Sequence, residues 1–210
     1  MSARSNAGRI GVYGASGSGK SAYTKQRIGK LRRVVVFDPL AEYDMRQTND
    51  LDEVRKAMVA NWDGFRIAYR PPPAMESAAL SGLCRLLMRA QQPFQDGAST
   101  KGMTLVVEEL NLAFPVAGGS ARCPGFAAIC SRGRHWGIEV FGISQRIAEI
   151  DTRFRGNCTE TVAFRQKGAR DRDTAAVEIG CKVGDLPGDN LLYLQSAGGK
   201  WTGPHKLTFK

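Results

Sequence analysis

The sequence predicts an α/β protein whose sheet is mostly parallel and covered by helices on both faces. Short runs rich in β-branched and aromatic residues recur along the chain, and segments with helical spacing of apolar residues lie between them. Runs such as Val34–Asp38 and Met103–Val107 are apolar at almost every position, as expected of strands buried on both faces. With 210 residues, of which 42% are hydrophobic, the chain is expected to form one domain over residues 1–210.

The expected elements alternate along the chain. The strands are Arg9–Tyr13, Val34–Asp38, Phe65–Tyr69, Met103–Val107, Ile138–Ile143, Thr161–Arg165 and Leu191–Leu194. The helices are Lys20–Lys30, Leu51–Asn61, Glu76–Gln91, Phe126–Arg134 and Asp171–Ile179. Glu76–Gln91 has leucines at positions 80, 83, 86 and 87, which is the spacing of one helix face. Strands that alternate with helices are typical of a parallel sheet.

The net charge of +10 points to an anionic partner. Eight basic residues and no acidic residue lie between Met1 and Phe37, and these are Arg4, Arg9, Lys20, Lys25, Arg27, Lys30, Arg32 and Arg33. A second basic region, from Arg146 to Arg172, is interrupted by acidic residues. Such a charge attracts polyanions, chiefly nucleic acid, or an anionic membrane surface. The alternative is a solvated basic face that only keeps the protein in solution.

Three features of the sequence favour a cytosolic protein. No run of about 18 apolar residues is present to span a membrane. The segment Met1–Arg9 is polar and is not followed by the apolar stretch of a secretory signal. The cysteines have no metal-binding spacing and are expected to be reduced thiols rather than zinc ligands; they are Cys84, Cys123, Cys130, Cys158 and Cys181.

A glycine-rich segment follows the first expected strand and precedes the first expected helix. Its eight residues match the pattern GxxxxGK[ST] in full, and they are Gly14, Ala15, Ser16, Gly17, Ser18, Gly19, Lys20 and Ser21. Glycines let backbone N–H groups curl around phosphates, and the start of the next helix adds a positive dipole. Lys20 is expected to reach the β- and γ-phosphates of ATP, and the Ser21 hydroxyl is expected to bind Mg²⁺. The strand–loop–helix context favours this interpretation over a glycine-rich turn without a ligand.

Two carboxylates, Glu108 and Glu109, follow the strand Met103–Val107. Hydrolysis of a nucleotide needs one carboxylate near Mg²⁺ and a second that orients or deprotonates the attacking water. We assign Glu108 to the metal, directly or through a water, and Glu109 to the water as catalytic base. Aspartate is the commoner residue on the metal side. The alternative is that both are surface acids at the end of a strand.

A glutamine and three arginines lie at or near the strand Ile138–Ile143. Gln145 follows the strand, and it is expected to contact the γ-phosphate or its water. An arginine placed on the γ-phosphate, often by a neighbouring subunit, accelerates phosphoryl transfer. Arg132, Arg134 and Arg146 are candidates for this arginine, of which Arg134 and Arg132 are favoured. The remaining arginines are expected to be solvated or to face DNA.

Together these segments resemble the FtsK–HerA superfamily of DNA-pumping ATPases. The matching segments occur in the order of that family, and they are GASGSGKS at Gly14–Ser21, FDPLAEY at Phe37–Tyr43, LVVEE at Leu105–Glu109, GRHWGIEVFGISQR at Gly133–Arg146 and LPGDNLLYL at Leu186–Leu194. Within that superfamily, the chain is in its small size most similar to the genome-packaging ATPases of tailless, tectivirus-like phages and viruses with an internal membrane. Two positions differ from the common pattern of the family. Glu108 stands where aspartate is commoner, and Ile147 stands where a proline often follows the SQR segment, residues 144–146.

The resemblance implies a RecA-like P-loop NTPase core and a homo-oligomeric ring, commonly a hexamer. It implies an ATP-driven translocase that draws double-stranded DNA into a preformed capsid, in the host cytoplasm or at the packaging vertex of the virion. Capsid or packaging-vertex proteins would then be partners. Contacts to DNA phosphates carry no base information, so binding should be sequence-independent. The candidate contacts are Arg153, Arg155, Arg165, Lys167, Arg170 and Arg172.

Two other functions compete with this interpretation. The first is a phage morphogenesis ATPase of the zonula-occludens-toxin type, which has a related P-loop domain and normally a transmembrane helix. The second is a small-molecule kinase, which requires an acceptor pocket and a lid and leaves the SQR segment and the +10 charge unexplained. Stimulation of ATP hydrolysis by double-stranded DNA separates the translocase from both.

Overall fold

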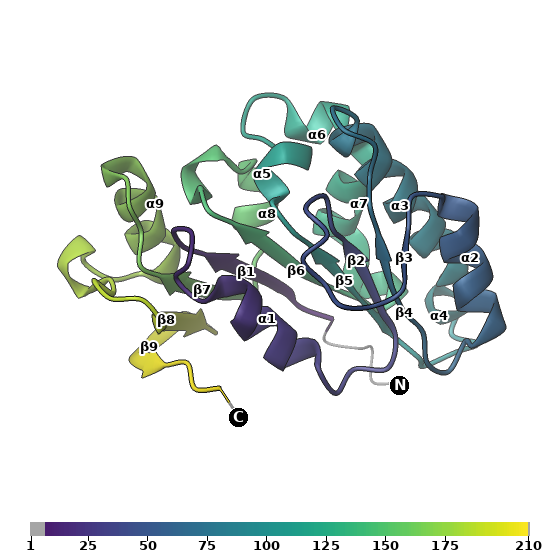
Figure 1. Cartoon of the computed structure of the whole chain (residues 1–210), viewed down its shortest axis with the longest axis horizontal. Coiled ribbons are helices and arrows are strands. Elements are labelled where there is room, and N and C mark those ends of the chain that lie inside the picture. Colours follow the sequence, from purple (N-terminus) through teal and green to yellow (C-terminus); the bar gives the residue numbers. More distant parts are fainter. Residues whose placement is uncertain (1–6, 210) are drawn as a thin grey trace.

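The computed structural model describes residues 7–209, so Arg4 of the basic N-terminal segment lies outside the described residues. Its nine strands form one sheet in the order β3-β4-β2-β5-β6-β1-β7-β8-β9 (Figure 1). The strands are β1 (Arg9–Tyr13), β2 (Val34–Phe37), β3 (Gln47–Thr48), β4 (Arg66–Tyr69), β5 (Met103–Val107), β6 (Ile138–Ser144), β7 (Glu160–Phe164), β8 (Leu192–Ala197) and β9 (Lys200–Lys206). All pairs from β3 to β7 are parallel, and β8 and β9 add two antiparallel pairs at one edge. The predicted α/β class with a mostly parallel sheet is confirmed.

Helices connect the strands in the predicted alternation. The helices are α1 (Lys20–Ile28), α2 (Leu51–Ala60), α3 (Glu76–Ala90), α4 (Gln92–Gln95), α5 (Leu110–Ala113), α6 (Gly119–Arg122), α7 (Pro124–Arg132), α8 (Thr152–Arg155) and α9 (Ala169–Ile179), and the 3-10 turns are η1 (Gly133–Trp136), η2 (Ile147–Glu149) and η3 (Val183–Asp185). The expected helix 126–134 starts two residues earlier, at Pro124, because proline suits the first turn of a helix. No helix within residues 7–209 is long and apolar enough to cross a membrane.

The two faces of the sheet are covered very differently. On one face, apolar side chains of α2, α3, α5, α7, α8 and α9 pack against inward residues such as Val35, Leu105 and Val107. On the other face, the packing helix is α1, through Tyr23 and Ile28, and it lies in front of the sheet in Figure 1. Successive residues of each strand point to opposite faces, so both clusters draw on the same strands. Helices cover both faces, as predicted, but six of the described helices pack on one face and α1 packs on the other.

The parallel strands bring their carboxyl ends to one edge of the sheet. The residues that follow β1, β2, β5, β6 and β7 therefore lie along the same edge, which we call the carboxyl edge. The residues that precede β2, β5 and β6 lie along the opposite edge, the amino edge. Ligands of open α/β sheets bind at the carboxyl ends of the strands, so the carboxyl edge is where a functional site is expected.

Candidate active site

The loop 14–19 connects β1 to α1, and glycine is required at two of its positions. A Cβ atom on Gly14 would lie 2.6 Å from the Cβ of Phe164 and 2.7 Å from the Oγ of Ser18, so a larger residue does not fit. Gly19 has a φ of 114°, which other residues rarely adopt. The sequence pattern therefore has a local cause, since these glycines let the chain turn tightly between strand and helix.

The start of α1 offers free hydrogen-bond donors to a phosphate. The first N–H groups of a helix have no partner inside it, and α1 has no side-chain cap. The hydroxyl of Ser18 is buried in the loop without a hydrogen-bond partner. The helix dipole adds a partial positive charge at the same place. Loop and helix start thus fit a bound polyphosphate, which would satisfy these donors.

Lys20 supplies the cation of the loop. Its side chain is buried, and its Nζ donates a hydrogen bond to the carbonyl oxygen of Ala15 at 3.0 Å. Burial lowers the pKa of Lys20, and the charges of Glu109, Glu108 and Glu42 act in the opposite direction. The ammonium group therefore bonds to its own loop, and the nearby negative charges are those of three glutamates. A bound phosphate chain would supply a new counter-ion for it.

Glu108 follows β5 and is buried at the carboxyl edge. Its Oε1 accepts a hydrogen bond from the hydroxyl of Tyr43 at 2.8 Å. Burial raises the pKa of Glu108 to about 7; the bond from Tyr43 lowers it, and the charges of Glu42 and Glu109 add to the rise. The ionised form of Glu108 is thus disfavoured, and a bound divalent cation would stabilise it.

Glu109 and Gln145 lie beside each other because they follow β5 and β6, which pair in parallel. The Nε2 of Gln145 donates to the Oε1 of Glu109 at 2.6 Å. Glu109 has a φ of 44° and a ψ of 51°, a left-handed conformation that costs a non-glycine residue about 1–3 kcal/mol and is concentrated at functional sites. The backbone is therefore strained at the residue assigned as catalytic base, and the fold holds its carboxylate beside an amide.

Glu42 is a site residue that the sequence interpretation missed. Its Oε2 accepts a hydrogen bond from the hydroxyl of Ser21 at 3.0 Å. The buried carboxylate of Asp38 fixes this segment by accepting from the backbone N–H groups of Glu42 at 3.0 Å and Tyr43 at 2.9 Å. The signal was present, because these acids belong to the segment FDPLAEY at the end of β2, and β2 pairs in parallel with β5.

The donor set fits Mg²⁺, the metal predicted for this edge. The Ser21 hydroxyl and the carboxylates of Glu42 and Glu108 are hard oxygen ligands. The part of the chain that the structure describes contains no group of three or more His, Cys, Asp or Glu side chains that could hold a metal ion by itself. Mg²⁺ commonly keeps several waters and binds through one or two carboxylates plus substrate phosphates, so the fit depends on a bound nucleotide.

Arg146 is engaged within its own chain. Its Nε lies 2.8 Å from the Oδ2 of Asp171, which is buried, and its Nη1 lies 3.1 Å from Glu149. The backbone N–H of Ala148 donates to the other oxygen of Asp171 at 3.1 Å. The Arg146 side chain is nevertheless 52% exposed, so its ion pairs lie at the surface of the chain. Arg132 and Arg134 stay the favoured candidates for the arginine that acts between subunits.

Arg132 and Arg134 lie at the amino edge, away from the loop. They precede β6, whereas Gln145 follows it, and a strand of seven residues is about 20 Å long. Both side chains are exposed, and the guanidinium of Arg132 lies 5.9 Å from the ring centre of Trp136. One chain therefore does not bring either arginine to its own phosphate loop.

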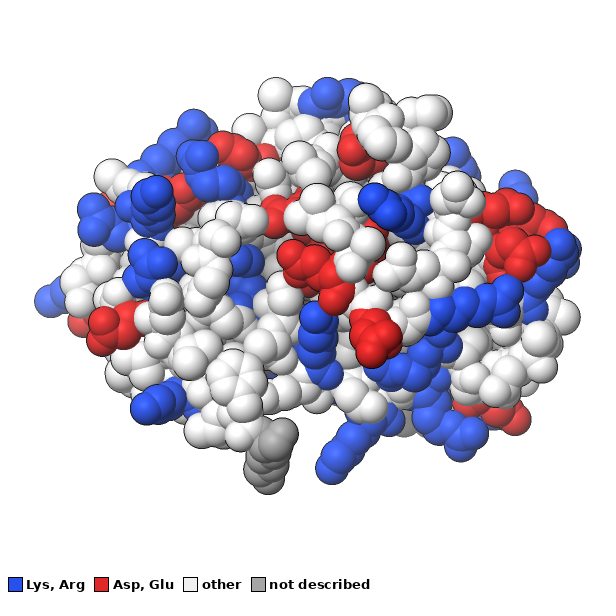
Figure 2. Space-filling view, viewed as in Figure 1, with Lys and Arg blue, Asp and Glu red and all other residues white. Residues whose placement is uncertain are grey.

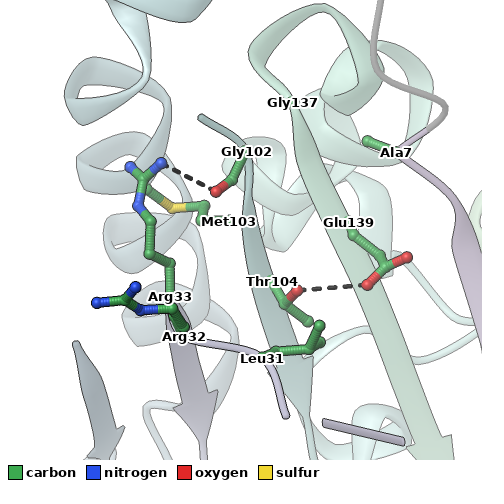
Figure 3. A pocket seen from close by; sticks show the side chains of 9 residues that line it. All are labelled: Ala7, Leu31, Arg32, Arg33, Gly102, Met103, Thr104, Gly137 and Glu139. Atoms are coloured by element: carbon green, nitrogen blue, oxygen red, sulfur yellow. Dashed lines mark hydrogen bonds between the residues drawn. The ribbon is translucent and has the colours of Figure 1, made fainter. Parts of the chain in front are cut away.

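A pocket of about 380 Å³ opens at the amino edge, between the starts of β2, β5 and β6 (Figure 3). Its side chains include Arg32, Thr104 and Glu139, and the Oγ1 of Thr104 donates to Glu139 at 3.3 Å. Burial raises the pKa of Glu139. No predicted site residue lines this pocket, so it is separate from the carboxyl edge.

The basic residues proposed to contact DNA divide into two groups. Arg153, Lys167, Arg170 and Arg172 are exposed, on or beside α8 and α9, and Figure 2 shows basic side chains crowded where Figure 1 draws α9. Two others are bound within the chain. Arg155 forms an ion pair with Glu178 at 2.5 Å and is only 13% exposed, and Arg165 donates to Asn190 at 2.9 Å. The exposed group is the better candidate for a polyanion contact.

Comparison with known proteins supports the fold. No protein-family model matches the chain, and no curated protein matches it either. Among solved structures it is similar to the genome packaging NTPase B204 of Sulfolobus turreted icosahedral virus 2 in complex with AMPPCP. That match has a TM-score of 0.74 and 12% sequence identity, and it covers 96% of this chain and 98% of B204.

Two larger proteins contain a similar domain. The conjugation coupling protein TcpA of pCW3 matches with a TM-score of 0.61 and 16% identity, over 93% of this chain and 58% of TcpA. EssC (ATPases 2 and 3) of Geobacillus thermodenitrificans matches with a TM-score of 0.61 and 12% identity, over 93% of this chain and 39% of EssC. The resemblance predicted from the sequence is thus confirmed for the fold: the chain has the P-loop fold that the genome packaging NTPase B204, TcpA and EssC share.

Proposed function

We propose that the protein is an ATPase that moves double-stranded DNA, as a genome-packaging motor. The observation that carries the proposal is the carboxyl edge, where a complete phosphate loop, Glu108 and the pair of Glu109 and Gln145 lie together. The fold adds support, because B204 is a genome packaging NTPase of similar length and was solved with ATP analogues. Residues 1–210 would act as one motor domain in a homo-oligomeric ring, with capsid or vertex proteins as partners.

Each residue of the edge has a task in this proposal. Lys20 and the N–H groups of the loop bind the β- and γ-phosphates, and Ser21 and Glu108, with Glu42 beside them, hold Mg²⁺ directly or through water. The metal, when bound, neutralises charge on the phosphates and fixes their geometry. Glu109 takes a proton from the attacking water while Gln145 orients it. Arg134 or Arg132 of the next subunit would complete the site.

The DNA-binding part of the proposal rests on charge and exposure. The exposed basic residues around α8 and α9 face solvent on a protein of net charge +10. Contacts to phosphates release counter-ions, so the affinity for DNA should fall steeply as salt rises and should not depend on sequence.

The central test measures ATP hydrolysis by the purified protein with and without linear double-stranded DNA at low salt. We expect hydrolysis, its stimulation by DNA, and a loss of about 10²–10³-fold or more in Lys20→Ala. Lys56→Ala, an exposed lysine on α2, is the matched control and should behave as wild type.

Each outcome separates the candidate functions. Hydrolysis that survives Lys20→Ala contradicts the assigned nucleotide site. Hydrolysis without any response to DNA, or a protein that fails to bind DNA at low salt, contradicts the translocase. Phosphoryl transfer to a small acceptor in place of water would favour the kinase.

A further inference from the structure

One buried carboxylate joins the SQR segment to α9. Asp171 lies in the first turn of α9, and its side chain is 3% exposed. One of its oxygens is 2.8 Å from the Nε of Arg146, and the other accepts from the backbone N–H of Ala148 at 3.1 Å. A carboxylate can accept several hydrogen bonds at once, and both oxygens of Asp171 are used on the segment 146–148. Asp171 therefore binds the segment that follows β6 to the start of α9, where Ile147 also packs with apolar residues of the helix.

The same segment touches the candidate catalytic base on its other side. Gln145 precedes Arg146, and its Nε2 is 2.6 Å from the Oε1 of Glu109. The hydroxyl of Ser144 accepts from the backbone N–H of Arg146 at 3.0 Å and donates to Asn111 at 2.8 Å. These bonds form a continuous connection from the acidic end of β5, through residues 144–146, to Asp171.

The far end of this connection is basic and exposed. Arg170 and Arg172 flank Asp171 on α9, and Lys167 lies just before the helix. All three side chains are exposed, whereas the carboxylate between them points inward to Arg146. A polyanion bound to these residues would therefore contact the first turn of α9. The buried side chain of that turn, Asp171, contacts the segment that follows Gln145.

We propose that Asp171 is the positioning residue that couples DNA contact at α9 to hydrolysis at the carboxyl edge. This inference rests on the proposed function. Asp171 touches neither nucleotide nor DNA; it sets the place of Arg146 and Ala148, and through them the place of Gln145 beside Glu109. A displacement of the first turn of α9 is transmitted to that pair because both oxygens of Asp171 are committed to the segment between them.

The experiment measures the ratio of DNA-stimulated to unstimulated ATP hydrolysis, together with the affinity for the same duplex DNA. Asp171→Asn keeps the shape of the side chain and removes its charge. We expect the ratio to fall by about fivefold or more, with the affinity for DNA unchanged relative to the control Asp173→Asn. Asp173 lies on the same helix, is exposed, and makes the same change in net charge.

A second variant approaches the ion pair from its exposed partner. Arg146→Gln removes the same contact at a side chain that is 52% exposed, so it keeps the test open if Asp171→Asn does not fold. The double variant should lose no more of the ratio than either single variant, since both remove one connection. A wild-type protein that ignores DNA overturns the proposed function and this inference together. A wild-type protein that responds to DNA, with Arg146→Gln or folded Asp171→Asn responding equally, overturns the coupling alone.

Discussion

The carboxyl and amino edges of the sheet carry different candidate residues for ATP hydrolysis. At the carboxyl edge of one chain, Ser21 bonds to Glu42 and Gln145 bonds to Glu109, and the charges of Glu42, Glu108 and Glu109 act on Lys20. At the amino edge, Arg132 and Arg134 are exposed beside the start of β6, with no predicted phosphate-binding residue near them.

The difference follows from the length of β6. Arg134 precedes this strand of seven residues and Gln145 follows it, so the strand separates them by about 20 Å. In the proposed function, one chain supplies the phosphate loop, the metal ligands and the base, and Arg134 or Arg132 comes from a second copy. The proposed site is therefore complete only in an assembly, and a substitution at either edge should impair hydrolysis.

The largest expected effect is at the carboxyl edge. Glu109→Gln keeps an oxygen that can accept the bond from Gln145 but cannot take a proton. We expect the rate of ATP hydrolysis to fall by about 10²–10⁴-fold, while nucleotide affinity stays close to wild type. Single-turnover hydrolysis and a fluorescent-nucleotide titration measure the two quantities. Glu53→Gln on α2 is the control, and a Glu109→Gln protein of normal rate would remove Glu109 from the role of base.

The next effect tests the amino edge. Arg134→Ala should lower the rate of hydrolysis by about 10²–10³-fold with nucleotide affinity retained, because the arginine acts on charge that develops during the reaction. Arg132→Ala is compared in parallel, and Arg89→Ala, an exposed arginine on α3, is the control.

Mixing experiments decide whether that arginine acts between subunits. A mixture of Lys20→Ala chains with Arg134→Ala chains should regain part of the activity that each lacks, because some interfaces then contain an intact loop and an intact arginine. If neither arginine variant changes the rate, the amino edge is not part of the site.

A smaller, roughly tenfold effect concerns pH. Burial raises the pKa of Glu108 to about 7, so the carboxylate is mostly protonated at pH 6 and mostly ionised at pH 8. A proton and Mg²⁺ compete for it, and the apparent affinity for Mg²⁺ should be about tenfold weaker at pH 6. Mg²⁺ titrations of nucleotide binding measure this. The difference between the two pH values should shrink in Glu108→Gln, and a difference of unchanged size would show that another group titrates.

The carboxyl edge was largely predictable from the sequence because its signals are local. The glycines of the loop 14–21 reflect steric limits at Gly14 and Gly19, and Glu108 and Gln145 follow apolar runs that could only be buried strands. Parallel pairing then places strand ends side by side. The same rule applies to Glu42, whose segment follows the parallel strand β2, but the sequence interpretation assigned no role to it.

Other features depend on tertiary contacts that no local pattern encodes. The ion pair of Arg146 with Asp171 joins residues 25 positions apart, on elements whose packing the sequence does not specify. The short helices α5, α6 and α8 have four residues each and too few positions to show periodicity. The strands β3 and β9 were not predicted, because β3 has two polar residues and β9 is exposed along almost its whole length, so both lack the apolar signal of the predicted strands.

The last predicted effect separates stability from catalysis at Glu108. A raised pKa means that ionisation is unfavourable in the folded state, so the carboxylate destabilises the fold above about pH 7 and has no such effect below its ordinary pKa of 4.5. Glutamine cannot ionise and can still accept the bond from Tyr43. Glu108→Gln should therefore increase the free energy of unfolding by about 3 kcal/mol at pH 8 and by almost nothing at pH 4. Urea unfolding without Mg²⁺ or nucleotide measures it, and equal destabilisation at both pH values would mean that Glu108 matters for packing rather than for its charge.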